Sequence, residues 1–254
     1  MAVRKPSQAA ALVAEIRDYC RAHHDPAGAQ RYARYFKEGY DAWGMLDPKH
    51  EFFNARQEEW FTKYQSLGLN GFIEAGALLF ESGKYEEGAI AIRFVKEFAE
   101  QFDAAALERM ESWFPSGVRN WAHTDVLCGT LLGPCLASGR FTLEDLAKWK
   151  ESPHRFQRRA VPVTMLDLLK KPHDTAALLE YVRPLMTDAE RVVHQGMGWF
   201  LREAWKKNAK PVEAFLLKWK DTAPRLIFQY ATEKMAPAAK ARFKAAPKGR
   251  GAKK

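Results

Sequence analysis

The sequence has little of several features that would define a function at once. Its 3 cysteines, Cys20, Cys128 and Cys135, match neither a metal-site spacing nor a disulfide framework, and its 7 histidines show no metal-ligand spacing. No run of about 18 apolar residues occurs, so no transmembrane helix and no membrane partner are expected. The opening stretch MAVRKPSQAAALVAEIRDYC has acidic residues where a secretory signal would be apolar. We therefore expect a soluble, cytoplasmic protein with buried free thiols and no bound metal.

The alternation of apolar and polar residues that marks β-strands is also missing. Apolar residues instead recur at intervals of three and four, as in AALVAEIRDYC and DTAALLEYVRPLM. Breaks in this pattern leave about a dozen helices of roughly three to five turns, or about 35–40 residues per helix pair. We predict an all-α fold, a curved α-solenoid of antiparallel helix pairs resembling HEAT repeats, as a single domain over residues 1–236. A compact helical bundle is the alternative.

Positive charge is distributed unevenly along the chain. Residues 1–120 carry 15 Lys/Arg and 18 Asp/Glu, whereas residues 121–236 carry 18 Lys/Arg and 13 Asp/Glu. Residues 237–254 add 7 Lys/Arg without any acid and have hardly any apolar face. We predict a disordered basic tail there, which would add non-specific attraction to nucleic acid. The second half of the body is the expected polyanion-facing half.

The stretch NWAHTD carries the first candidate for chemistry. Trp121 and Asp125 are four residues apart and therefore share one face of a predicted helix. A helical tryptophan is more often part of the core, and an aspartate near it is usually solvated. The functional alternative is an aromatic wall beside a working carboxylate, and the motif alone does not separate the two. His123 faces another side of this helix, which favours a structural histidine.

Two further segments carry candidates. In HQGMGWFLREAWKKN, Trp199 follows Gly196 and Gly198, and each mid-helix glycine costs about 1 kcal/mol relative to alanine. Such glycines indicate close approach to the backbone, either by another helix or by a ligand. In HRFQRRAVPV, Arg158 and Arg159 lie near a predicted helix start, and an arginine fork can pair with two phosphate oxygens.

Taken together and in this order, NWAHTD, RRAV and GMGWFLRE resemble the AlkD-type DNA alkylation-repair glycosylases, which are built from HEAT-like repeats. The segment RYARYFKEGYDAWGM, residues 31–45, also looks like the opening of that family, and the resemblance extends over roughly residues 8–235. It implies that Trp121, Asp125 and Trp199 are the catalytic residues. It also implies contacts to double-stranded DNA, which we assign to Arg159, Arg158, Tyr35, Arg202, Lys206 and Lys207.

The residue chemistry agrees with this resemblance. An N3- or N7-alkylated purine is cationic and leaves readily, so one carboxylate that stabilises the developing sugar cation and orients a water is sufficient. Indole faces attract cations. We therefore predict a monomeric, monofunctional DNA glycosylase that removes cationic alkylated purines, of the 3-methyladenine and 7-methylguanine type, without a cofactor.

Two alternatives stay open. Family members commonly have an acid directly after the motif tryptophan, where this chain has Ala122. The chain would then be a catalytically weak or inactive HEAT-repeat protein that binds bent, branched or damaged DNA by shape. A HEAT-repeat scaffold for a protein partner is the other alternative, and it predicts DNA binding that depends on the tail alone.

Overall fold

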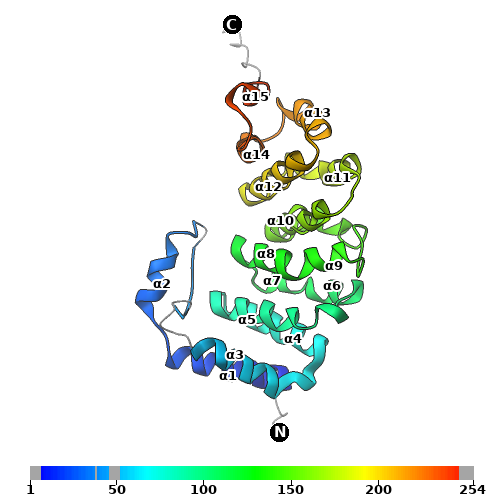
Figure 1. Ribbon diagram of the computed structural model, residues 1–254. Coiled ribbons are helices and arrows are strands. Elements are labelled where there is room, and N and C mark those ends of the chain that lie inside the picture. Colours follow the sequence, from blue (N-terminus) through cyan, green and yellow to red (C-terminus); the bar gives the residue numbers. More distant parts are fainter. Residues whose placement is uncertain (1–6, 38, 46–51, 246–254) are drawn as a thin grey trace. The chain divides into compact units, whose positions relative to one another are not determined.

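The computed structural model describes residues 7–37, 39–45 and 52–245, and within them every regular element is helical (Figure 1). The prediction of an all-α fold of the α-solenoid class is therefore confirmed. The chain divides into two compact units, Met1–Asp145 (unit 1) and Leu146–Lys254 (unit 2). The sequence predicted a single HEAT-like repeat domain over residues 1–236.

Unit 1 is built from helices that pack on α4 and α5. Its helices are α1 (Gln8–Ala22), α2 (Pro26–Ala33), α3 (Phe52–Tyr64), α4 (Gly68–Glu81), α5 (Tyr85–Lys96), α6 (Ala104–Met110), α7 (Trp113–Ser116), α8 (Trp121–Leu127) and α9 (Gly133–Ala137). A π-helical turn, Cys128–Leu132, joins α8 to α9. Helix α4 packs against α1, α5, α6 and α7, and α5 packs against α8. Several of these helices are shorter than the predicted three turns.

Aromatic rings and one close backbone approach hold the centre of unit 1. Phe72 stacks on Phe61 at 5.2 Å and meets Phe94 edge-on at 5.3 Å. The indole of Trp113 lies so close to Gly76 that a Cβ there would be 2.4 Å from a ring carbon. The Trp113 Nε1–H donates to the carbonyl of Ile73 at 2.9 Å, so this buried indole is satisfied.

A buried carboxylate attaches the segment after α2 to the first turn of α5. Glu86 is 0 % exposed, and its oxygens accept hydrogen bonds from the amides of Trp43, Gly44 and Met45 at 2.7–2.9 Å. Gly44 has φ +83°, and a Cβ there would lie 2.0 Å from the carbonyl oxygen of Asp25. Only glycine fits this position, so Gly44 and Glu86 together fix the path of residues 39–45.

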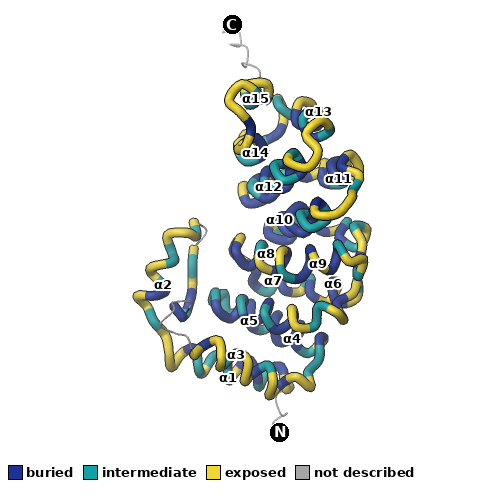
Figure 2. The backbone as a smooth tube through the Cα atoms, in the orientation of Figure 1, coloured by how far each residue is buried: buried dark blue, intermediate teal, exposed yellow. Residues whose placement is uncertain are grey.

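Unit 2 is arranged around its longest helix. It contains α10 (Arg155–Thr164), α11 (Thr175–Val182), α12 (Arg191–Lys207), α13 (Ala209–Trp219), α14 (Arg225–Ala231) and α15 (Pro237–Ala241), with 3-10 turns at Ala147–Glu151, Met165–Lys170 and Arg183–Thr187. Helix α12 packs against α10, α13 and α14 and is buried along most of its length (Figure 2).

The predicted disordered tail is ordered at its start. Residues 237–245 include α15, and Phe243 is 1 % exposed. Arg242 pairs with Glu213 at 2.7 Å, and Arg225 donates to the carbonyl of Phe243 at 2.9 Å. The sequence did not indicate this because one buried phenylalanine is a weak signal among lysines and alanines. Residues 246–254 of the predicted tail lie outside the described residues.

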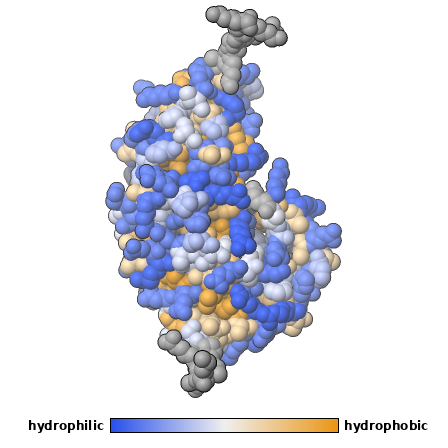
Figure 3. All heavy atoms as spheres, turned by 180° about the vertical axis from the view of Figure 1, so that it is seen from behind, coloured by the Kyte–Doolittle hydropathy of each residue, from blue (hydrophilic) through white to orange (hydrophobic). Residues whose placement is uncertain are grey.

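The surface of both units is mostly polar. In Figure 3 hydrophilic side chains dominate the visible face of each unit, with apolar patches between them. Across the described part of the chain, no helix combines the length and the apolar character needed to cross a bilayer. All three cysteines are buried and free, as the sequence predicted.

Candidate functional site

The NWAHTD motif opens helix α8 in unit 1. Asn120 is the N-cap residue, and its Oδ1 accepts the backbone N–H of His123 at 2.8 Å. Trp121 is therefore the first residue of α8 and Asp125 lies one turn further on. The cap explains why the motif starts with asparagine, and it fixes where both candidate side chains emerge.

His123 ties α8 to α5. Its Nδ1 faces the amide nitrogen of Asn120 at 2.9 Å, and its Nε2 faces the carbonyl oxygen of Tyr85 at 2.8 Å. The first contact requires an acceptor and the second a donor, so the ring is neutral with its proton on Nε2. Complete burial lowers its pKa from 6.5 to about 4. The interpretation of His123 as a neutral structural residue is confirmed.

Trp121 lies at the surface of unit 1 and not in its core. Its side chain is 36 % exposed, and one face stacks on Phe36 with the ring centroids 5.6 Å apart. Phe36 in turn stacks on Tyr40 at 4.6 Å and meets Tyr85 at 5.5 Å. The aromatic residues between α2 and Gly44 therefore support the indole, while its remaining surface is open to solvent.

Asp125 is half-buried, on the same side of α8 as Trp121. The intervening residues Ala122, His123 and Thr124 are buried, and the solvent-facing side of the helix includes Trp121, Asp125 and the exposed Val126. This arrangement places a partly exposed aromatic side chain one turn from a half-buried aspartate, and the role of the pair in catalysis stays a prediction.

Sequence reasoning missed the pocket beside the Asn120 cap. Its volume is about 260 Å³, and its lining includes Tyr40, Asp41, Tyr85 and Arg119. Arg119 is exposed and directly precedes the cap, where its guanidinium lies near Gly83. A lone arginine before a short helix carries no pattern in the sequence. The residue becomes notable only through its position next to Asn120.

In unit 2, the glycines around Trp199 serve helix packing. A Cβ at Gly198 would lie 2.4 Å from the Cβ of Tyr230, so the glycine lets α14 approach α12. A Cβ at Gly196 would lie 3.2 Å from the Cγ of Arg159, whose side chain crosses this part of α12. Of the two explanations that the sequence left open, the approach of another helix applies. Trp199 itself is half-buried.

Two predicted phosphate-binding arginines are engaged inside unit 2. Arg159 is 5 % exposed and donates to the carbonyl of Val192 at 2.7 Å. Arg158 binds both oxygens of Asp188, at 2.6 and 3.1 Å, and donates to the carbonyl of Ser152 at 2.7 Å. The Arg158 guanidinium therefore holds two loops together, and its contact to phosphate stays a prediction. As placed, Arg159 is a buried cation beneath α12.

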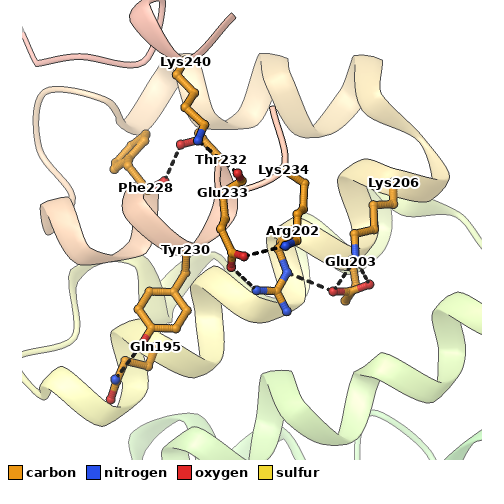
Figure 4. A network of polar contacts seen from close by, with 10 residues as sticks. All are labelled: Gln195, Arg202, Glu203, Lys206, Phe228, Tyr230, Thr232, Glu233, Lys234 and Lys240. Carbon is orange, nitrogen blue, oxygen red and sulfur yellow. Dashed lines mark hydrogen bonds and ion pairs between the residues drawn. The ribbon is translucent and has the colours of Figure 1, made fainter. Parts of the chain in front are cut away.

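The basic residues at the end of α12 belong to an ion-pair network (Figure 4). Arg202 donates to Glu203 and Glu233, and Lys206 pairs with Glu203 at 2.9 Å. These carboxylates neutralise much of the charge that the sequence assigned to DNA contact. Lys207, next along the helix, is exposed at the C-terminal end of α12.

Tyr35 lies at the surface of unit 1, as a backbone-contacting residue would. Its ring is 54 % exposed, and its hydroxyl accepts a hydrogen bond from Arg34 at 2.9 Å. The Arg34 guanidinium also lies 4.9 Å from the ring centroid. The aromatic ring of Tyr35 and the guanidinium of Arg34 therefore lie together at the surface.

Comparison with known proteins identifies relatives of this chain. The family model described as DNA alkylation repair enzyme matches residues 16–235. No match was found among curated proteins. Among solved structures, the chain is similar to a predicted DNA alkylation repair enzyme from Enterococcus faecalis, with a TM-score of 0.60 and 16 % sequence identity. That similarity covers 85 % of this chain and 98 % of the other, and at this identity it supports the fold alone.

Proposed function

The chain belongs to the DNA alkylation repair enzyme family, and we propose that it is a monofunctional DNA glycosylase acting as a monomer on double-stranded DNA. Its substrates would be cationic alkylated purines of the 3-methyladenine and 7-methylguanine type. The observation that carries this proposal is the pair on α8, where the half-buried carboxylate of Asp125 lies one turn from the half-exposed indole of Trp121.

The proposed reaction uses the substrate's own charge. Alkylation at N3 or N7 makes the purine a cation, so it departs as a neutral base without protonation by the enzyme. The bond that breaks is the N-glycosidic bond, whose electron pair leaves with the purine. Asp125 stabilises the resulting sugar cation and accepts a proton from the water that adds to C1′. A partly desolvated carboxylate is more effective here than one in bulk water.

Trp121 would bind the lesion nucleotide through its open face. Indole attracts a cation by about 0.5–2 kcal/mol, depending on desolvation, which favours an alkylated purine over a neutral one. Trp121 is suited to this because Phe36 supports one face and leaves the other surface open. Trp199, half-buried on α12, is the candidate in unit 2.

The phosphate contacts are reassigned from the paired to the exposed cations. Lys207 and Arg119 are exposed, and Arg34 accompanies the exposed Tyr35. Arg159 would act through the electrostatic field of a buried cation, since its side chain offers almost no surface to a phosphate.

The test is single-turnover release of 7-methylguanine from a methylated duplex at saturating protein. We expect Asp125→Asn to lower the rate by about 100-fold or more, in line with the loss of one transition-state contact. Asp18→Asn is the matched control, because its carboxylate lies on α1 and is 73 % exposed. Release by Asp125→Asn at the wild-type rate would refute the mechanism.

Salt dependence tests the reassigned phosphate contacts. Each phosphate neutralised contributes about 0.9 to the slope of log K against log salt concentration. We expect Lys207→Gln to reduce the slope by about this amount, and Arg158→Gln to leave it unchanged because Arg158 is bound to Asp188. A reduced slope for Arg158→Gln alone would reverse the assignment.

A second candidate function is shape-selective DNA binding without excision. The observation that favours it is Ala122, which is buried and offers no second carboxylate next to Asp125. A protein of this kind would shift a bent or damaged duplex on a gel and release no base. Base release by the wild-type protein excludes it.

A further inference from the structure

Gly129 is an exposed glycine one helical turn beyond Asp125. It lies in the π-helical turn Cys128–Leu132, within the continuous run from Trp121 to Ala137. An added Cβ at Gly129 would meet no atom within 4 Å, so the position faces open space. Along this run Trp121, Val126 and Gly129 are exposed and Asp125 is half-buried, and Trp121, Asp125 and Gly129 lie on one side at intervals of four.

Neither conformation nor packing explains this glycine. Elsewhere in the described residues, a glycine with open space around it has positive φ, as at Gly39, Gly68 and Gly139. The helical glycines of those residues have a neighbouring atom where a Cβ would be, or are buried: Gly28, Gly71, Gly76, Gly88, Gly133, Gly196 and Gly198. Among the glycines of the described chain, Gly129 alone combines helical backbone with free space.

Glycine at this position lowers the stability of the local helix. Glycine disfavours helix relative to alanine, and the π-turn already departs from the regular hydrogen-bond pattern. Thr130 Oγ1 also bonds back to the carbonyl of Val126 at 2.7 Å, a contact that tends to bend helices. Alanine would fit the space and strengthen the helix. Its absence indicates that something other than this chain approaches the backbone at Gly129.

The short side chain of Asp125 indicates which part of a DNA ligand lies near Gly129. An aspartate extends only two carbons from the backbone, so a deoxyribose that touches Asp125 must itself lie close to the helix. A longer side chain one turn further on would hold the DNA away from that carboxylate. The distance along the helix from Asp125 to Gly129 is about 6 Å. This corresponds to between one and two base steps of a duplex, at roughly 3.4 Å each.

We propose that Gly129 is the contact point for the sugar–phosphate backbone of the nucleotide next to the lesion. This inference rests on the proposed glycosylase function and adds to it a residue that sets how closely DNA approaches Asp125. The strip Trp121–Asp125–Gly129 then gives the direction of the bound strand, which runs along α8. Gly129 is a positioning residue, and side-chain size at this position determines the fit of the DNA.

The test is a size series at this position. Gly129→Ala and Gly129→Leu are compared with Ala105→Leu, which places a leucine side chain at an exposed position of α6. Three quantities are measured: the melting temperature, the Kd for a methylated duplex, and the single-turnover rate of 7-methylguanine release at saturating protein. We expect Gly129→Ala to melt at the wild-type temperature or above and to excise roughly 10-fold more slowly. We expect Gly129→Leu to excise about 100-fold more slowly and to bind more weakly, and Ala105→Leu to match wild type.

The outcomes separate this proposal from the proposed function. Wild-type binding and excision by Gly129→Leu would overturn the role of Gly129 and leave the function of Asp125 intact. If the wild-type protein released no base, the proposed glycosylase function would be wrong. The Kd values alone would then test whether Gly129 contacts DNA. In that case, equal Kd values for Gly129→Leu and Ala105→Leu would overturn the contact, whereas weaker binding by Gly129→Leu alone would support it as a DNA contact.

Discussion

Replacing Glu86 by glutamine tests how the segment beneath Trp121 is held. The carboxylate is completely buried and accepts three backbone hydrogen bonds, two at Oε1 from Gly44 and Met45 and one at Oε2 from Trp43. Glutamine keeps its oxygen for the pair of amides. Its NH₂ group then faces the N–H of Trp43, so that one hydrogen bond becomes a contact between two donors.

The structure sets the size of the effect. Hydrogen bonds to a charged group contribute about 1.5–3 kcal/mol each, and roughly half of that when the partner is neutral. One bond is lost and two are weakened, so we expect residues 43–45 to open more easily by about 3–6 kcal/mol. At 1.4 kcal/mol per factor of ten, the lower figure corresponds to a fall of roughly 100-fold in amide exchange protection.

Residue-resolved hydrogen exchange at the amides of Trp43, Gly44 and Met45 measures this directly. Glu58→Gln is the matched control, since that carboxylate is 72 % exposed and pairs with Arg93 at the surface. We also expect base release to slow in Glu86→Gln, because Phe36 stacks on Tyr40, which belongs to the segment 39–45 that Glu86 holds. Unchanged protection at these three amides would refute the reasoning.

Three further predictions concern stability. Gly44→Ala should lower the free energy of unfolding, measured by urea titration, by about 3 kcal/mol or more, because the new Cβ would lie 2.0 Å from a carbonyl oxygen. Gly139→Ala is the control: its φ is +78° but the space around it is open, so the free energy of unfolding should fall by only about 1 kcal/mol. The lowered pKa of His123 means that, as pH falls from 6.5 to about 4, the unfolded chain binds a proton that the folded protein does not. Stability should therefore be lost over this window, by about 3 kcal/mol in all, and His123→Gln should flatten that part of the profile; an identical slope would contradict the assignment. Phe243→Ala should lower the free energy of unfolding of unit 2 by about 3–4 kcal/mol, and a melting temperature equal to wild type would show that α15 contributes nothing.

Local periodicity was enough to predict the fold class. Spacings of three and four recur from α1 to α14, so an all-helical chain with packed helix pairs followed from the sequence alone. The shared helix face of Trp121 and Asp125 could also be predicted, because residues four apart lie on one side of any α-helix. The resemblance to alkylation-repair proteins rested on the order of three short motifs, and the family match over residues 16–235 bears it out.

Ion pairs between residues far apart in the sequence could not be predicted from it. Arg158 and Asp188 are 30 residues apart, and no local pattern shows that one neutralises the other. The same applies to Arg202 and Glu233, so the charge count of α12 overstated its capacity for phosphate. The support of Trp121 by Phe36 depends on a chain path fixed by Glu86 and Gly44, which only the folded structure reveals.

The buried thiols have a chemical consequence for a protein of alkylation repair. Cys20, Cys128 and Cys135 are all almost completely buried, and burial raises the pKa of Cys20 far above its usual range and that of Cys135 to about 11. The thiolate is the nucleophile in reactions with electrophiles, and the raised pKa values keep Cys20 and Cys135 protonated at neutral pH. The reagents that methylate purines therefore meet no reactive sulfhydryl on the described surface.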